Sequence, residues 1–227
     1  QRFSRMKTKL TKRLRILCGE ILVCDIFADV GCDHGYCAQY ALEHGLCRKA
    51  YISDISAKSL QKAETLLAPY IAEGRVESVC CAGLEKIPRE AEAVMIAGMG
   101  GEEIISILKN GFLPQKLLLQ PMQNVPKVRA FLLENGYAIL RDFTFQDGKY
   151  YDVLFAERGG AGRKYDARSI EFGYDNLHSP SEDFRLKVEE DITKCRVRLE
   201  RAGEPVPAVE ERLRVLAEIR DEIARGV

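Results

Sequence analysis

Short apolar segments alternate with amphipathic helical patterns over residues 26–135, and this alternation restricts the fold more than any other feature of the chain. Strands are predicted at 26–31, 50–54, 76–81, 93–97 and 116–120. Helices are predicted between them, at about 36–44, 57–73, 102–109 and 124–135. Strands and helices in this order form a parallel sheet that is covered by helices on both faces.

Two later strand patterns form a predicted hairpin. Residues 137–145 and 150–157 flank Asp147-Gly148, and Asp-Gly between strand patterns is a strong signal for a tight turn. The last strand must therefore run antiparallel to the others. The fold class predicted for this part is α/β, a Rossmann-like doubly wound sheet of seven strands.

The pattern changes after Arg158, where a glycine-rich connector, 159–164, begins. A helix is predicted from Ser181, a residue type that caps helix N-termini, and 203–207 interrupts it. Apolar residues at spacings typical of a narrow helical stripe follow on both sides of that break: Phe184, Val188, Ile192, Cys195, Leu199 and Ala202, then Val209, Leu213, Leu216 and Ile223. We expect a coiled-coil-like antiparallel helical hairpin, and two domains, 1–158 and 159–227.

The end of the first predicted strand, Ala28-Asp-Val-Gly-Cys-Asp-His-Gly-Tyr36, is where an open α/β sheet binds its ligand. Asp29 and Asp33 would oppose the pyrophosphate of a dinucleotide, but they favour the cationic sulfonium and ammonium of S-adenosylmethionine. Asp54 ends the second strand and suits the ribose hydroxyls of either cofactor. A tight turn alone explains the glycines but not the three acids, so the sequence favours S-adenosylmethionine.

The fourth predicted strand runs into Ile96-Ala-Gly-Met-Gly-Gly-Glu102, whose glycines let the backbone approach a ligand closely. Enzymes that methylate exocyclic amines commonly carry an Asn/Asp-Pro-Pro-aromatic motif at this place. Because the motif is absent from this segment, chemistry on an exocyclic amine is disfavoured.

Six segments together resemble the TrmK family over nearly the whole chain. They are Lys12–Leu14, Ala28–Tyr36, Gly83–Glu85, Ile96–Gly101, Leu118–Pro121 and Lys149–Tyr151. The family consists of bacterial tRNA (adenine-22-N1)-methyltransferases with a class I methyltransferase domain and a C-terminal helical domain. The resemblance implies an enzyme that uses S-adenosylmethionine to methylate N1 of an adenine in tRNA.

Three positions depart from the family pattern. Ala82 replaces an acid that is able to bind the adenine amine of the cofactor. Met122 replaces an asparagine after Gln-Pro, and Asn124 lies two residues further on. Cys32 stands where serine is commoner. Ala82 and Met122 leave open a cofactor-binding scaffold without catalysis. A methyltransferase of a different class, which acts on a small molecule and has a dimerising helical arm, also stays open.

The resemblance and the strand ends imply a set of site residues. Cofactor contacts are expected at Asp29, Gly31, Asp33, His34, Gly35, Asp54, Ile55, Gly83, Leu84, Gly98, Met99 and Gly100. Substrate contacts are expected at Arg5, Lys9, Lys12, Arg13, Tyr36, Gln120, Pro121 and Tyr151. Asp29 is the candidate catalytic carboxylate, which would stabilise the cationic product ring, or else it only holds the cofactor or the turn. For Tyr36 and Tyr151, core packing and base stacking both stay open.

Charge and cysteine content set further expectations. The formal net charge is zero, yet residues 1–15 carry seven basic side chains and no acid, which favours either a tRNA-facing segment or a solvated helix face. Eight cysteines without a C-x-x-C pair, beside three histidines, indicate reduced thiols in a cytoplasmic protein and no metal site. No apolar run has the length of a membrane helix, so a membrane partner is not expected. Oligomeric state stays open.

Overall fold

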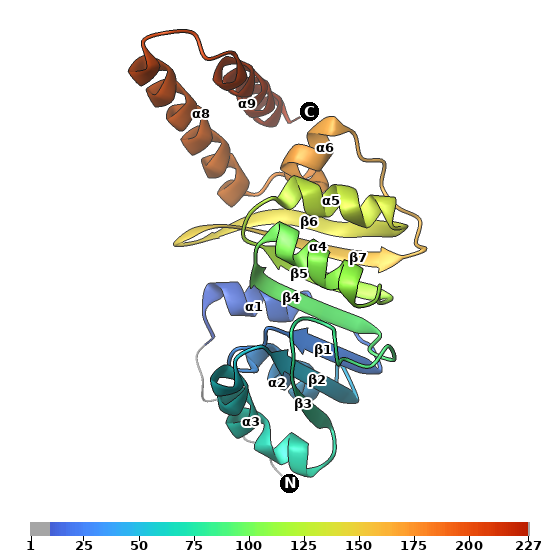
Figure 1. Cartoon of the computed structure of the whole chain (residues 1–227). Coiled ribbons are helices and arrows are strands. Elements are labelled where there is room, and N and C mark those ends of the chain that lie inside the picture. The colour runs from blue at the N-terminus through green and yellow to red at the C-terminus, as the bar shows by residue number, and fades with distance from the viewer. Residues whose placement is uncertain (1–9, 227) are drawn as a thin grey trace. The chain divides into compact units, whose positions relative to one another are not determined.

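A computed structural model describes residues 10–226, and its centre is one seven-stranded sheet in the order β3-β2-β1-β4-β5-β7-β6 (Figure 1). The strands are β1 (Ile26–Val30), β2 (Lys49–Asp54), β3 (Val76–Cys80), β4 (Ala93–Met99), β5 (Lys116–Pro121), β6 (Tyr137–Asp147) and β7 (Lys149–Arg158). The first five strands pair in parallel, and β7 pairs antiparallel with β5. The predicted fold class and the hairpin at Asp147-Gly148 are confirmed.

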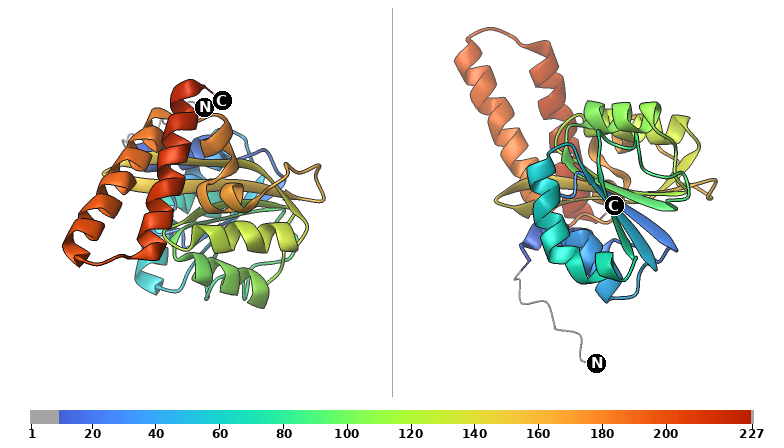
Figure 2. Two further views of the ribbon diagram at one scale, coloured as in Figure 1. Left: turned by 90° about the horizontal axis from the view of Figure 1, so that it is seen from above. Right: turned by 60° about the horizontal axis from the view of Figure 1, so that its bottom comes forward.

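Helices cover the sheet on both faces (Figure 2). From β1 the chain moves outward in one direction through α2 (Tyr36–Glu43) and α3 (Ala57–Ala72), and from β4 in the other through α4 (Gly101–Asn110) and α5 (Val125–Glu134). Right-handed crossovers therefore place the two pairs on opposite faces. Because both of its faces are covered, β1 is buried along its whole length.

A further helix, α1 (Lys12–Gly19), was not predicted from the sequence. Thr11 caps it by accepting a hydrogen bond from the backbone N–H of Leu14, and only Leu17 and Cys18 are buried. Eight residues with two buried side chains give too short an apolar pattern to recognise. The helix packs against α2, so tertiary contact, rather than helical periodicity, stabilises it.

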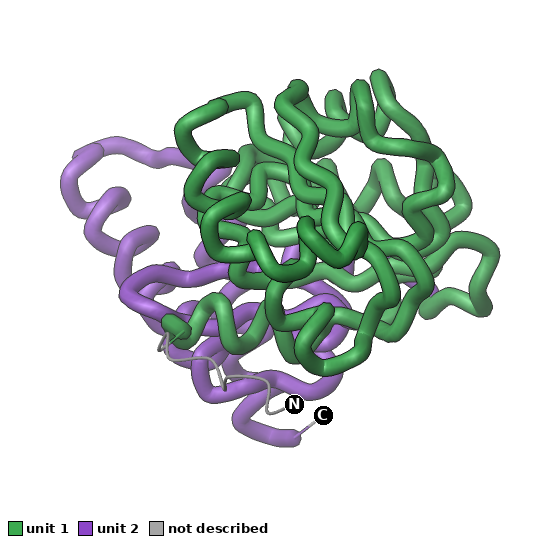
Figure 3. The backbone as a smooth tube through the Cα atoms, turned by 90° about the horizontal axis from the view of Figure 1, so that it is seen from below, with its two compact units in different colours: residues 1–140, 153–163 green, residues 141–152, 164–227 purple. Residues whose placement is uncertain are grey.

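The chain divides into two compact units that alternate along the sequence (Figure 3). Within the described residues, unit 1 comprises 10–140 and 153–163, and unit 2 comprises 141–152 and 164–226. Unit 2 thus includes the tip of the β6–β7 hairpin with α6 (Ala167–Phe172), α7 (Tyr174–His178), α8 (Glu182–Ala202) and α9 (Pro207–Arg225). The predicted domain boundary after Arg158 stays a prediction.

Unit 2 has its own apolar core, made by Phe172, Phe184, Val188, Ile192, Leu216, Ile219 and Ile223. Ser181 caps α8 by accepting from the N–H of Phe184, as predicted, and α8 packs against α9. Buried Asn176 of α7 accepts from the N–H of Thr144 at 2.9 Å and donates to its hydroxyl at 2.7 Å. These bonds connect the hairpin tip to α7. The sequence patterns predicted neither α7 nor the other short helix, α6.

Candidate active site

A pocket of about 640 Å³ opens at the carboxyl ends of β1, β2, β3 and β4, within unit 1. Its size lies within the range of ~300–1,000 Å³ that is typical of ligand sites. The predicted cofactor residues that line it are Asp29, Gly31, Asp33, His34, Asp54, Ile55, Gly83, Leu84, Gly98 and Met99. Two others, Gly35 and Gly100, are not among the lining residues, and their contact with a cofactor stays a prediction.

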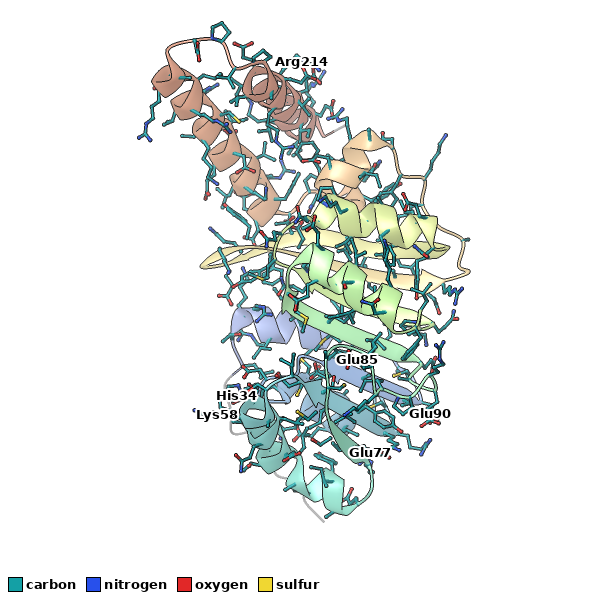
Figure 4. The ribbon with its side chains drawn as sticks, in the orientation of Figure 1. His34, Lys58, Glu77, Glu85, Glu90 and Arg214 are labelled. Carbon is teal, nitrogen blue, oxygen red and sulfur yellow. The ribbon has the colours of Figure 1, made fainter. Side chains whose placement is uncertain are left out.

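The loop after β1 is held in a tight turn beside β2. The backbone N–H groups of Gly31 and Cys32 both donate to the carbonyl of Ser53, at 2.8 and 3.0 Å. Asp33 then adopts a left-handed conformation with φ of 48°, which Asp tolerates better than most residues do. Its carboxylate lies 2.8 Å from Nδ1 of His34, which is labelled in Figure 4.

Asp54 ends β2 with its carboxylate fixed on both sides. Oδ1 accepts from the N–H of Ser56 at 2.8 Å, and Oδ2 lies 3.4 Å from the N–H of Asp33. Next to it, Ile55 is 77% exposed, which is unusual for a large apolar side chain. A carboxylate with free lone pairs beside an uncovered apolar side chain suits a sugar hydroxyl followed by a flat ring.

Asp29 is the one acid of the pocket that is fully buried, with 2% of its surface exposed. Burial raises the pKa of its carboxyl from 3.8 to about 7. A hydrogen bond from the N–H of Ala38, in the first turn of α2, acts in the opposite direction, and the charge of Asp54 adds a smaller upward contribution. The carboxyl group therefore changes its charge close to neutral pH.

Acids outnumber bases among the side chains that line the pocket. Its ionisable lining residues include Asp29, Asp33, Asp54, Glu85 and Glu103, against the basic side chains of Arg13 and His34. Such a wall attracts a cationic ligand and repels pyrophosphate. The residues present thus fit a sulfonium cofactor. Within residues 10–226, no three His, Cys, Asp or Glu side chains gather as metal ligands.

Arg13 connects α1 to the strand ends. Its Nε donates to Oε1 of Gln120 at 2.8 Å, and a Cβ built on Gly98 would lie 3.0 Å from its guanidinium. Gln120 is completely buried and Pro121 is buried as well, so the Gln120 side chain holds Arg13 in place. A contact of Gln120 or Pro121 with the substrate stays a prediction.

Of the other predicted substrate residues that the structure describes, Tyr36 lines the pocket and Lys12 and Tyr151 are not among its lining residues. Tyr36 lines the pocket and stacks on His34, with 5.5 Å between ring centroids, whereas Lys12 is exposed outside the lining. Tyr151, in unit 2, stacks on Phe145 with 5.3 Å between centroids, so one face of its ring is covered. Arg5 and Lys9 lie outside the described residues.

Several lining residues were missed by sequence reasoning. On α4 they are Glu103, Ser106, Ile107 and Asn110, and on α1 they are Leu14 and Leu17. The signal on α4 was present, because its residues recur at spacings of three, one and three and therefore share one helix face. That this face lines a pocket depends on how α4 packs, which the spacing does not show.

All eight cysteines are free thiols, and six of them are buried. Cys32, Cys37 and Cys81 line the pocket, and burial raises the pKa of the Cys32 thiol. The Cys32 thiol is therefore protonated and unreactive at neutral pH. No helix within residues 10–226 has the length and apolarity needed to span a membrane.

Comparison with known proteins identifies the class. A family model described as a methyltransferase domain matches residues 10–154, and with the doubly wound sheet and the acid-lined pocket this defines a Rossmann-like methyltransferase. The curated tRNA (adenine(22)-N(1))-methyltransferase of Bacillus subtilis (strain 168) is 32% identical over 171 residues, 73% of this chain and 72% of the relative. The chain belongs to the TrmK family.

Solved structures agree on the fold. TrmK of M. capricolum, in complex with S-adenosyl-homocysteine, is 22% identical with a TM-score of 0.83, and the match covers 93% of this chain and 98% of that one. The B. subtilis m1A22 tRNA methyltransferase TrmK is 24% identical with a TM-score of 0.73, covering 96% and 98%. At these identities the matches show the shared fold of both parts of the chain.

Gly101→Ala should destabilise the protein, because the loops after β4 and β5 meet at this residue. A Cβ there would lie 2.5 Å from the carbonyl oxygen of Gln123 and 2.8 Å from that of Asn124, both backbone atoms. We expect a loss of about 1–3 kcal/mol in urea unfolding. Gly19→Ala, where a Cβ meets nothing within 4 Å, is the matched control and should be neutral. Equal stability of the two variants would contradict this account of the loop contact.

Proposed function

We propose that this protein transfers a methyl group from S-adenosylmethionine to N1 of an adenine in tRNA, at position 22. The observation that carries the proposal is the acid-lined pocket at the strand ends, in a chain whose family includes an enzyme named for this reaction. We infer position 22 from the activity for which that relative is named. We infer that the cofactor is cationic from the acids that line the pocket.

Different pocket residues are proposed to bind different parts of the cofactor. When bound, S-adenosylmethionine supplies a methyl group on a cationic sulfur. Asp54 is placed to accept hydrogen bonds from ribose hydroxyls, and the turn at Gly31 gives backbone access beside them. Asp29 and Asp33 supply negative charge for the cationic groups.

Methylation at adenine N1 requires little proton chemistry from the protein. N1 carries an in-plane lone pair, so no base is needed to activate it, and the ring becomes cationic as the new N–C bond forms. The chain therefore contributes alignment, exclusion of water and negative charge near the base. Asp29 is the candidate for that charge, because it is buried in the pocket and close to ionisation at neutral pH.

N1 lies on the Watson–Crick edge, so the target base must be unpaired or turned out of the tRNA. Tyr36, half-buried in the pocket wall, is a candidate platform for that base. Arg13, held by Gln120 beside Gly98, is our candidate for binding a phosphate near the target nucleotide. A cytoplasmic location follows from a tRNA substrate.

The direct test incubates the purified full chain with methyl-labelled S-adenosylmethionine and unmodified bacterial tRNA, followed by mass spectrometry of nucleosides. Label in 1-methyladenosine, lost when adenine 22 is replaced by guanine, supports the proposal. Label in small metabolites but not in tRNA would support a small-molecule methyltransferase instead. Bound cofactor without turnover on either substrate would indicate a scaffold.

Charge reversal of the basic N-terminal segment should weaken tRNA binding. Changing Arg5, Lys9 and Lys12 to Glu removes up to three phosphate contacts, so the slope of log affinity against log salt should flatten by about 2–3. Reversal of the exposed Lys58, Lys62 and Lys86 is the matched control and should change the slope less. Filter binding at several salt concentrations measures both slopes. If both triple variants bind alike, the N-terminal segment does not contact tRNA.

A further inference from the structure

The far end of the pocket lies between the loop after β3 and the last turn of α4. β3 pairs with β2 so that Cys80 is opposite Asp54, and the N–H of Cys81 donates to the carbonyl of Asp54 at 3.3 Å. A ribose held by Asp54 therefore directs its base toward the loop Cys81–Glu85. Glu85, labelled in Figure 4, marks the end of this loop.

This end of the pocket offers apolar side chains for a flat ring. Exposed Ile55 comes from the loop after β2, Leu84 from the loop after β3, and Ile107 from α4, and all three line the pocket. The last turn of α4 is in close contact with the loop. A Cβ on Gly83 would lie 2.8 Å from Ile107, and one on Gly111 would lie 2.5 Å from the Cβ of Leu84.

Asn110 and Ser106 supply polar atoms beside these apolar side chains. The Nδ2 of Asn110 donates to the hydroxyl of Ser106 at 3.1 Å, and both residues line the pocket. This bond uses one of the two amide hydrogens and orients the amide group. One N–H donor and the carbonyl Oδ1 acceptor are left on the same side chain.

An amide matches adenine better than the alternatives at this end do. Adenine presents its amino group as a donor next to a ring nitrogen acceptor, and asparagine satisfies both at once. Ala82 has only a methyl group, and Glu85, as an ionised carboxylate, only accepts hydrogen bonds. We propose that Asn110, oriented by Ser106, recognises the adenine of the methyl donor. This inference rests on the proposed function.

Calorimetric binding of two cofactor products separates recognition of the amine from general affinity. S-adenosylhomocysteine carries the adenine amine, whereas S-inosylhomocysteine carries a carbonyl oxygen in its place. Wild type should prefer the adenine compound. Asn110→Ala should bind it about three- to tenfold more weakly, bind the inosine compound with little change, and so lose the discrimination. Ser106→Ala should reduce the discrimination partly.

Glu85→Ala is the matched control, since this residue is exposed and lines the same end of the pocket. It should keep the wild-type discrimination. Loss of discrimination in Glu85→Ala, or its retention in Asn110→Ala, would overturn the assignment of Asn110. Failure of wild type to bind S-adenosylhomocysteine at all would overturn the proposed function, and this inference with it. Thermal melts of each variant confirm that the fold is intact.

Discussion

Asp29→Asn should abolish the pH dependence of cofactor binding and weaken that binding at pH 8 by at least about tenfold. Burial raises the pKa of Asp29 to about 7, so near neutral pH the carboxyl is only partly ionised. A cationic ligand favours the ionised form. Below pH 7, wild-type binding must therefore release a proton, and its affinity should fall toward tenfold per pH unit.

The measurement is calorimetric titration with S-adenosylmethionine, whose sulfonium is cationic, between pH 5.5 and 8.5, in two buffers that differ in ionisation enthalpy. The difference in heat between the buffers counts the protons released. His34→Gln is the control for the imidazole of His34, which also lines the pocket. This variant should keep most of the pH dependence of binding that wild type shows. A wild-type affinity that does not change over this range would show that Asp29 does not sense the charge of the ligand.

The same substitution should stabilise the ligand-free protein, by up to about 4 kcal/mol above pH 7. The folded-state pKa of Asp29, about 7, lies above its ordinary value of 3.8. As the pH rises from 4 to 7, the unfolded chain releases this proton before the folded chain does. Asp29 therefore makes the free energy of unfolding of wild type fall through that window and level off above it.

Asparagine has no such titration, so the stability gain should be near zero at pH 4 and largest above pH 7. Urea unfolding at pH 4.5, 6 and 8 measures the gain, with Asp33→Asn as the control, because Asp33 is exposed. If Asp29→Asn were less stable than wild type at pH 8, the N–H of Ala38 would be stabilising an ionised carboxylate, contrary to this account. Weaker cofactor binding and higher stability of Asp29→Asn would together show that Asp29 strengthens cofactor binding but lowers the free energy of unfolding.

The sheet could be predicted from the sequence because its strands are short apolar runs between helical patterns. β1 is buried throughout, and Asp147-Gly148 forms the turn of the β6–β7 hairpin. The helices α1, α6 and α7 could not be predicted, because five to eight residues carry too little periodicity. Each of them depends on partners distant in sequence, as Asn176 depends on Thr144.

The site could be predicted where it consists of strand ends, because parallel strands bring their carboxyl ends to one edge. Asp29, Gly31 and Asp54 line one pocket for that reason. The wall formed by α4 could not be predicted, because it depends on the contact of Ile107 with Gly83. The burial of Gln120 beneath Arg13 likewise depends on α1, a helix without a clear pattern.

The central claim is that the acid-lined pocket selects a cationic methyl donor. The most direct test is calorimetric titration of the purified full chain with S-adenosylmethionine and, separately, with NADH. S-adenosylmethionine should bind at one site with release of a proton near pH 7, and NADH, which carries a pyrophosphate, should give no heat of binding. Binding of NADH without any binding of S-adenosylmethionine would contradict the account.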